Sequence, residues 1–383
     1  MSSLKDLFLL DPSVTYLNHG SFGATPKPVF RTYQRWQREL EKQPVEFLDR
    51  RHDGLMLSAR AALAAYLGTR AQDVVFTQNV TIALNIVARS LELGPADEVL
   101  TTDHEYGALD RTWRFLSKER GFAYINQTIP APLNSPEQFV EALWAGVTPR
   151  TRVVFLSHIT SRTAIIFPVV EIIRRARQAG IISIVDGAHA PGQIPLALQD
   201  LGADFYGGNL HKWLCAPKGA GFLYARPEVQ DLLKPLVVSW GYESESPSGS
   251  TFIDHHEFWG TRDIAAFLSV PTAIEFQHKH HWQDVQESCH QLAREAQQRI
   301  CNLTGLPPLH SSDDIWFRQM CTAPLPSGMD ILELKRRLYD EYRIEIPLIQ
   351  WGAYKLVRVS IQAYNDSGDV DRLLNALCKL LSR

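Results

Sequence analysis

The stretch IISIVDGAHAPGQIPLALQDLGADFYGGNLHKWLCAPKGAGFLY at residues 181–224 decides the fold. It opens with a mainly apolar run, Ile181–Val185, in which Ser183 is the one polar residue, and this run stops at Asp186. A second, shorter run ends at Gly208, shortly before Lys212. A run rich in β-branched residues between turn signals is typical of a strand covered on both faces, as in parallel sheets. Functional groups in such sheets gather beyond the carboxyl ends of the strands. We therefore predict that Asp186 and Lys212 reach one crevice from two strand ends.

A carboxylate that faces a lysine suits pyridoxal phosphate (PLP). This cofactor needs a lysine for its aldehyde and an acid that keeps its ring nitrogen protonated. The alternative interpretation is a strand-end aspartate in an ion pair and an unrelated surface lysine, because short motifs are common by chance. The spacing alone leaves both interpretations open.

Composition limits the class of protein. A chain of 383 residues is long enough for two domains, since single cores seldom grow past roughly 250–300 residues. The formal net charge of −3 argues against nucleic acid or a membrane surface as the main partner. The five cysteines form no C-x-x-C pair, which fits reduced thiols in a cytosol. The N-terminus shows no signal-peptide core, and no apolar run reaches the roughly 18 residues of a membrane span. We expect a soluble cytoplasmic protein.

A strand–turn–helix unit near the start of the chain offers a candidate phosphate site. A short strand, Val74–Phe76, leads through Asn79 and Thr81 into a helical run, Ile82–Leu91. A helix N-terminus after a polar turn is a ready anion site, because its first N–H groups have no partner inside the helix. The alternative is that Asn79 or Thr81 merely caps the helix, and capping and phosphate binding can coexist.

The next strand ends carry candidate ring contacts. Glu98–Thr102 is followed by His104 and Tyr106, and Val153–Ser157 by Ser161. An imidazole at a strand end could stack on a pyridine ring, and a phenol beside it could move protons. The alternative is a histidine satisfied within its loop and a tyrosine that packs by its ring.

Helical signals over Arg31–Gly68, broken at Pro44, and over Pro168–Gln178 separate the strands, which predicts a parallel sheet with right-handed crossovers. The last third predicts a smaller α+β domain. Its expected elements are strands at Asp314–Gln319, Ile344–Ile349 and Lys355–Ile361, and helices at Gly328–Tyr342 and Asp369–Leu381. Before it, we expect a short helix at Arg226–Leu236 and a long helix at Pro271–Leu303. The crowded His278, His280 and His281 are interpreted as a solvated helix face rather than as a metal site, and no metal is expected.

Six blocks in this order resemble the aminotransferase class V branch of fold-type I PLP enzymes, most closely the isopenicillin N epimerase-like group. They are YLNHGSFG at 16–23, DHEYGA at 103–108, VDGAHAPG at 185–192, GNLHKWLCAPKGAGFLY at 208–224, WGTRD at 259–263 and RVSIQAYN at 358–365. The resemblance implies an α/β large domain at 15–255 with a mainly parallel seven-stranded sheet sandwiched by helices. It also implies a small α+β domain at 256–383, an N-terminal arm at 1–14 that packs with the small domain, and a homodimer with active sites at the subunit interface.

The resemblance also implies roles for single residues. Lys212 would bind PLP covalently, Asp186 would pair with the ring nitrogen, His189 would touch the ring hydroxyl with Ser161 as a polar neighbour, and His104 would stack on the ring. The phosphate would be held by Asn79, Val80, Thr81, Asn209 and His211, with Thr261 supplied by the partner subunit. Arg358, in an otherwise apolar strand, would clamp the α-carboxylate of the substrate. Asn18 and His19, in a glycine-bearing turn, would approach the substrate, although the turn alone favours a plain loop.

One departure from the pattern of the family narrows the reactions that we expect. Cysteine desulfurases of this family carry a catalytic cysteine on a loop before the carboxylate-binding arginine, but here the matching stretch, IEIPLIQWGAYKL at 344–356, has none. Cys215 is interpreted as a buried structural thiol. Desulfuration by persulfide transfer is therefore not expected. The resemblance to the isopenicillin N epimerase-like group implies an epimerase or racemase acting on an amino acid or a peptide, in which Lys212 would remove the Cα proton and Tyr106 would serve as a second acid. The alternatives are a C–S lyase of the ergothioneine-pathway type, a class V aminotransferase, or a PLP-fold binding protein without catalysis.

Overall fold

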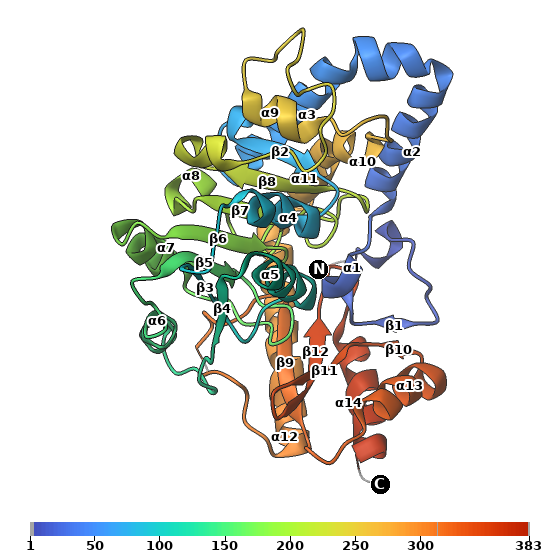
Figure 1. The fold of residues 1–383 in the computed structure, drawn as a ribbon. Coiled ribbons are helices and arrows are strands. Elements are labelled where there is room, and N and C mark those ends of the chain that lie inside the picture. Colours follow the sequence, from blue (N-terminus) through green and yellow to red (C-terminus); the bar gives the residue numbers. More distant parts are fainter. Residues whose placement is uncertain (1–3, 312, 382–383) are drawn as a thin grey trace.

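The strands that carry Asp186 and lead to Lys212 run side by side in the middle of a seven-stranded sheet (Figure 1). The computed structural model describes residues 4–311 and 313–381. The strand order is β2-β8-β7-β6-β5-β3-β4, and only β8 runs antiparallel to its neighbours, which confirms the predicted mainly parallel sheet. The strands are β2 (Val74–Thr77), β3 (Glu98–Thr102), β4 (Ala123–Gln127), β5 (Thr151–Ser157), β6 (Ile182–Gly187), β7 (Phe205–Asn209) and β8 (Gly221–Ala225).

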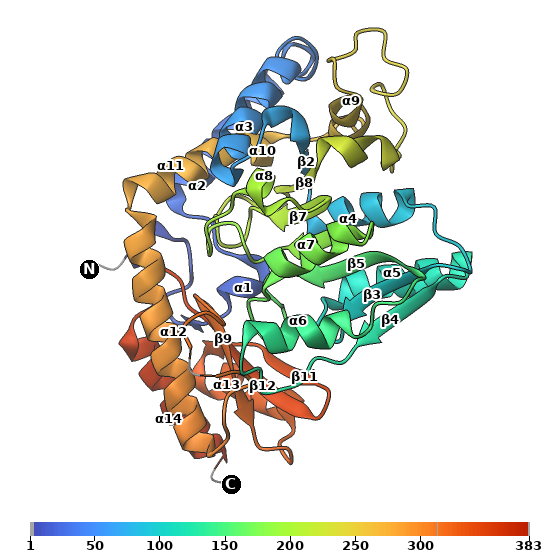
Figure 2. The same ribbon diagram turned by 90° about the vertical axis from the view of Figure 1, so that its left-hand side faces the viewer.

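Helices cover both faces of this sheet (Figure 2). Helices α4 (Val80–Ser90) and α5 (Gly107–Arg120) lie on one face, and α6 (Pro136–Trp144) and α7 (Val169–Gln178) on the other. Along β5, Val153 and Phe155 belong to the core under α4 and α5, whereas Val154 and Leu156 belong to the core under α6 and α7. Because successive side chains of a strand point to opposite faces, an unbroken apolar run is what such a doubly covered strand requires.

The N-terminal part of the chain, which precedes β2, is mainly helical. It contains η1 (Lys5–Leu7), β1 (Thr15–Tyr16), α1 (His19–Phe22), α2 (Lys27–Lys42), the π-helical turn η2 (Glu46–Arg50), α3 (His52–Leu67) and η3 (Ala71–Asp73). As expected, the helical region breaks near Pro44, and α3 ends at Gly68, whose φ of +63° is easily reached only by a residue without Cβ.

The remaining elements form the segment after β8. This segment begins with the turn η4 (Pro227–Leu232), the helices α9 (Thr251–Glu257), α10 (Ala265–Leu268) and α11 (Val270–Lys279), and the long helix α12 (Trp282–Thr304). One short helix, α8 (Leu198–Leu201), lies earlier, between β6 and β7. A three-stranded antiparallel sheet has the order β11-β12-β9, built from β9 (Met320–Leu325), β11 (Leu348–Trp351) and β12 (Tyr354–Ser360). Helices α13 (Ile331–Tyr342) and α14 (Ser367–Leu381) pack beside it, and β10 (Ile344–Glu345) pairs in parallel with β1.

Several predicted elements in this segment were wrong. The single helix at 271–303 is two helices, because His281 adopts a left-handed conformation with φ +47° and interrupts the hydrogen-bond ladder. The strand expected at 314–319 starts only at Met320, after turns that bury Trp316 and Phe317. Pro347, which has no N–H to donate, separates β10 from β11. The helix expected at 226–236 is a 3₁₀ turn that ends at Leu232.

The predicted N-terminal arm makes contacts with the predicted small domain, although residues 1–3 lie outside the described residues. The ring of Phe8 meets those of Phe276 and Tyr364 with centroid distances of 6.4 and 4.9 Å. The domain boundaries themselves remain a prediction. No helix within residues 4–311 and 313–381 is long and apolar enough to span a membrane.

Candidate active site

A cavity of about 250 Å³ opens at the carboxyl ends of the strands of the large sheet. It is lined by Ser21, Phe22, Asn79, Val80, Thr81, Tyr106, Ser157, Ile159, Ser161, Asp186, Ala188, His189, Asn209, His211 and Lys212. Asp186 and Lys212 both line it, so the predicted convergence of these two side chains is found. Most of the residues predicted for PLP lie in this one cavity.

The acid and the amine perturb one another. The Asp186 carboxylate is buried and accepts a hydrogen bond of 2.8 Å from the Ala188 N–H, and burial raises its pKa to about 6, although the positive charge of Lys212 opposes this shift. The pKa of Lys212 is lowered to about 7, chiefly because protein surrounds the amine and also because Arg358 is positively charged, whereas Asp186 acts in the opposite direction. An amine with such a pKa is available as a base near neutral pH.

His189 is oriented toward the lysine by Trp213. The Trp213 Nε1–H donates to His189 Nδ1 at 3.1 Å, so the neutral imidazole carries its proton on Nε2. This Nε2 lies 3.2 Å from Lys212 Nζ. Burial and the neighbouring charge of Lys212 lower the pKa of His189 well below its usual value, which keeps the ring neutral. His189 can therefore donate one hydrogen bond into the cavity.

The backbone that carries Lys212 is enclosed by two glycines. A Cβ on Gly23, whose φ is +69°, would lie 1.9 Å from the His211 carbonyl oxygen. A Cβ on Gly192, whose φ is +85°, would lie 2.3 Å from the Trp213 carbonyl carbon. Both contacts are with backbone, so the loop can approach only residues without a side chain.

The α4 end of the cavity presents polar groups suited to an anion. Asn79 caps α4 by accepting from the Ile82 N–H at 3.0 Å, and Asn209 Oδ1 accepts from the Val80 N–H at 2.9 Å. His211 Nδ1 donates to the Ala220 carbonyl at 3.2 Å, and burial lowers its pKa to about 4. The capping interpretation of Asn79 is thus confirmed, and its side chain also lines the cavity together with that of Thr81.

The structure places the two ring-bearing candidates after β3, His104 and Tyr106, differently. His104 does not line the cavity: it is 1% exposed, its ring lies 4.2 Å from that of Trp351, and its Nδ1 bonds to Thr163 Oγ1 at 2.7 Å. Tyr106, two residues further and 41% exposed, is the aromatic side chain of this loop that does line the cavity. The stacking role of His104 stays a prediction, and in this structure Tyr106 rather than His104 lines the cavity.

The residues predicted to bind the substrate do not all lie at the cavity. His19 is fully buried, with Nδ1 2.9 Å from the Tyr364 hydroxyl and Nε2 3.0 Å from the Lys212 carbonyl oxygen, so it has no face for a substrate. Asn18 is buried as well and lies outside the cavity lining, donating through Nδ2 to Glu345 Oε1 at 2.9 Å. The loop expected around them is instead the short helix α1, whose His19 and Gly20 are buried, and a substrate contact of Asn18 or His19 stays a prediction.

Arg358 reaches the rim of the cavity through two residues that line it. Its guanidinium donates to the Ser161 carbonyl at 2.6 Å and to Ser21 Oγ at 2.9 Å, and its buried Nε has no hydrogen-bond partner in the described structure. None of the ion pairs formed by the described residues includes Arg358. A buried cation without an acid is costly unless a ligand supplies the charge.

Some lining residues were missed, and Thr261 lies elsewhere. Ser21, Phe22 and Ser157 had no signal beyond their membership of quoted motifs or strand ends. Thr261 is exposed and borders a separate pocket of about 310 Å³ with Val45, Leu48 and Phe258. It therefore does not reach the Asp186 cavity of its own chain.

Comparison with known proteins identifies the family. Residues 16–373 match the family described as Aminotransferase class-V. The chain belongs to the aminotransferase class-V family. Isopenicillin N epimerase from Amycolatopsis lactamdurans is 38% identical over 391 residues, covering 99% of this chain and 98% of that protein. Putative L-cysteine desulfhydrase 2 from Oryza sativa subsp. japonica is 27% identical over 425 residues, covering 97% and 85%.

Among solved structures, a mutant of C-DES with glycine covalently linked to its PLP cofactor is similar, with a TM-score of 0.83 and 22% identity over 96% of this chain and 97% of that one. The fold is thus the fold-type I architecture that the sequence predicted. Class-V proteins are PLP-dependent enzymes, so this chain is an enzyme whose cofactor is pyridoxal 5′-phosphate. The residues of the cavity fit the cofactor, because an amine, a buried acid and an anion-ready helix N-terminus line the same space.

Proposed function

We propose that the chain is an amino-acid epimerase or racemase that acts on an amino acid or an amino-acid-containing peptide. The observation that carries this proposal is the placement of two proton carriers around Asp186. Lys212 follows β7 and Tyr106 follows β3, and the sheet order β7-β6-β5-β3 puts these strand ends on opposite sides of β6, which bears Asp186. Both side chains line the same cavity. The similarity to the epimerase of Amycolatopsis lactamdurans, at 38% identity, supports the proposal.

In the proposed site, Lys212 binds the cofactor aldehyde, Asp186 holds a proton at the ring nitrogen, and His189 Nε2–H contacts the ring hydroxyl. Thr81, Asn209 and His211 hold the phosphate at the N-terminus of α4. When bound, PLP withdraws electrons from the Cα of an attached amino acid, which makes the Cα–H acidic.

The proton chemistry then falls to side chains of this chain. Once the amine of the substrate has replaced it at the cofactor aldehyde, Lys212 would take the Cα proton from one face as a neutral amine, because its pKa is lowered to about 7. The Tyr106 hydroxyl gives a proton to Cα from the other face, which inverts the configuration. Exchange with water through the open side of Tyr106 returns both groups to their starting protonation states. Arg358 binds the α-carboxylate, and this carboxylate supplies the negative charge that pairs with the buried guanidinium.

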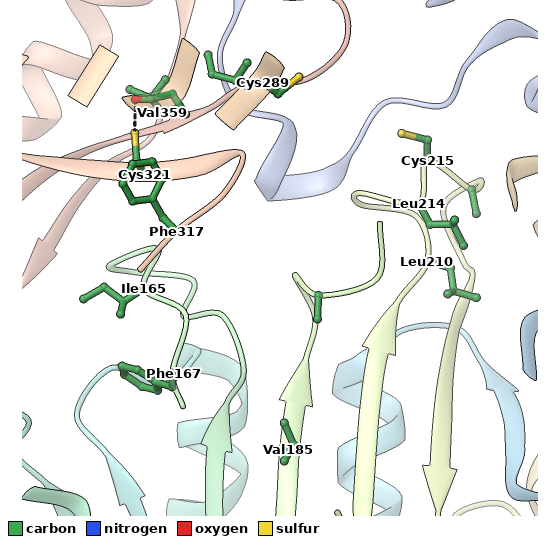
Figure 3. Close-up of a cluster of buried hydrophobic side chains, with 14 of the residues drawn as sticks. Ile165, Phe167, Val185, Leu210, Leu214, Cys215, Cys289, Phe317, Cys321 and Val359 are labelled. Atoms are coloured by element: carbon green, nitrogen blue, oxygen red, sulfur yellow. Dashed lines mark hydrogen bonds between the residues drawn. The ribbon is translucent and has the colours of Figure 1, made fainter. Parts of the chain in front are cut away.

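A C–S lyase is the second candidate, because the Oryza sativa relative carries a desulfhydrase name. In that case Tyr106 would protonate a sulfur leaving group at Cβ. Transfer of sulfur to an enzyme thiol finds no support, because no cysteine lines the cavity among the described residues. Cys215 is fully buried among side chains that include Leu210 and Leu214 (Figure 3), and burial raises its pKa to about 12. This burial supports the interpretation of Cys215 as a structural thiol.

Incubation with single enantiomers of amino acids in heavy water distinguishes the candidates. For an epimerase, deuterium enters Cα and the configuration inverts. Tyr106→Phe should still exchange the Cα proton through Lys212 but with retention of configuration, whereas Tyr339→Phe, an exposed tyrosine remote from the cavity, should behave as wild type. Release of pyruvate and sulfide from cysteine would favour the lyase, accumulation of the pyridoxamine form the aminotransferase, and wild-type inversion by Tyr106→Phe would remove Tyr106 from the mechanism.

We also propose a homodimer in the cytoplasm. Thr261 cannot serve the cavity of its own chain, and the surface around it exposes Val45 at 61%. In the proposed dimer, Thr261 of one subunit reaches the phosphate site of the other. Light scattering of the purified protein tests this proposal, and a monomer with full activity would contradict it.

A further inference from the structure

One short N-terminal segment, Asn18–Gly23, contacts both halves of the site. At one end of the segment, the Leu17 carbonyl accepts from the Ser360 N–H at 3.0 Å, just beyond Arg358 on β12. At its other end, Gly23 lies against the His211–Lys212 backbone. Figure 1 shows α1, which contains most of the segment, beside the C-terminal strands. The segment is thus placed between the arginine and the lysine.

On the lysine side, the contact is made by His19. The Lys212 carbonyl oxygen can only accept, so His19 Nε2, 3.0 Å away, donates, and Nδ1 accepts from the Tyr364 hydroxyl at 2.9 Å. The ring is therefore a neutral imidazole with both nitrogens engaged, and burial lowers its pKa to about 3. It joins the peptide of Lys212 to the segment that follows β12.

On the arginine side, the contact is made by Ser21. Its hydroxyl accepts from Arg358 at 2.9 Å and donates to Asn18 Oδ1 at 2.6 Å, and Asn18 Nδ2 donates to Glu345 Oε1 at 2.9 Å. Along this row of hydrogen bonds, each group donates to the next one, from the guanidinium to the Glu345 carboxylate. The guanidinium is thus oriented by the same segment that holds the lysine backbone.

We propose that Asn18–Gly23 is a positioning segment that fixes the Arg358 guanidinium relative to the Lys212 amine, with His19 acting on the lysine and Ser21 on the arginine. This inference rests on the proposed role of Arg358 as the carboxylate clamp. His19 and Ser21 are positioning residues that act through Lys212 and Arg358.

The test compares norleucine with pentylamine, which is the same amine without the carboxylate. Binding is followed by the change in the visible absorbance band of the bound cofactor, a readout that is independent of whether the enzyme epimerises, eliminates or transaminates. Ser21→Ala should weaken norleucine by roughly tenfold and leave pentylamine unchanged. His19→Phe should slow the reaction with both amines by a similar factor and leave their affinity ratio unchanged, and His19→Gln, which keeps a donor, should recover part of the rate.

Matched controls exist elsewhere in the chain. His290 is buried and bonds to the Arg318 carbonyl at 3.1 Å, and Ser90 is buried and both donates to the Ile86 carbonyl and accepts from the Lys234 N–H. His290→Gln and Ser90→Ala should leave both amines unaffected.

If His19→Phe does not fold, Tyr364→Phe removes the hydroxyl that orients His19 and should slow both amines in the same direction. An equal loss for both amines in Ser21→Ala would overturn the arginine half of the proposal. An unchanged rate with pentylamine in His19→Phe, or in Tyr364→Phe where that variant takes its place, would overturn the lysine half.

Discussion

Gly23→Ala provides a direct measure of how tightly the lysine loop must be placed. The new Cβ would lie 1.9 Å from the His211 carbonyl oxygen and 3.0 Å from the Lys212 Cα, whereas ordinary contacts begin at 3.4 Å. The loop must therefore retreat by roughly 1 Å or more, a displacement that can cost about 100-fold in rate when it moves a reacting group. The positive φ of +69° adds a backbone cost of about 1–3 kcal/mol to the free energy of folding.

Gly305→Ala is the matched control, because Gly305 has a similar φ of +70° but its Cβ would meet nothing within 4 Å. Both variants should lose stability in thermal unfolding, but only Gly23→Ala should lose about 100-fold in the rate of Cα-proton exchange, measured by NMR in heavy water. If the two variants lose equal activity, or if Gly23→Ala exchanges at the wild-type rate, then contact with the loop does not position Lys212 and the reasoning fails.

Three further outcomes follow from buried polar groups. Glu257→Gln leaves the Arg60 guanidinium, 7% exposed, without its carboxylate and should lower the free energy of unfolding by about 3 kcal/mol in urea titrations; a change below about 1 kcal/mol would mean that the pair is solvated. Burial raises the pKa of Glu105 to about 7 from its ordinary 4.5, so between pH 4.5 and 7 the folded protein keeps a proton that the unfolded chain releases. The stability that Glu105 contributes is therefore full below pH 4.5 and is lost as pH rises through 7. Glu105→Gln should therefore cost less stability at pH 8 than at pH 5 in melting of the cofactor-free protein, and the reverse order would contradict the burial argument. Asn209→Ala removes the side-chain amide that is proposed to hold the phosphate and that accepts from the Val80 N–H, so it should weaken cofactor binding by roughly tenfold in absorbance titrations; an unchanged affinity would contradict this role.

The sequence was sufficient where a local pattern and a global requirement agree. The run at 181–185 is apolar apart from Ser183 because β6 is covered on both faces, and the polar residues after the run could only lie at the strand end. Asp186, Lys212 and Asn209 were therefore predictable from strand ends and the family motifs. The position of Arg358 was predictable in the same way, as a charge in a strand that is otherwise apolar.

The sequence was insufficient where a side chain's direction depends on distant partners. Whether His104 or Tyr106 enters the cavity is decided by Trp351, which packs on His104 from 247 residues further along the chain. His19 sits in a turn-like motif but points to Tyr364 and the Lys212 carbonyl, which no local pattern reveals. The break at His281 depends on one residue with positive φ, a conformation that histidine only occasionally adopts.

The pairing of β1 with β10 has a consequence for how the enzyme matures. Residues 15–16 pair with residues 344–345, so this N-terminal strand has no partner on the ribosome until nearly all of the polypeptide has emerged. Contacts between such distant positions form late, because closing the long intervening loop is entropically costly. We expect that chains shortened before residue 344 bury much of the large sheet yet never acquire activity, since the partners that hold the N-terminal segment have not been made.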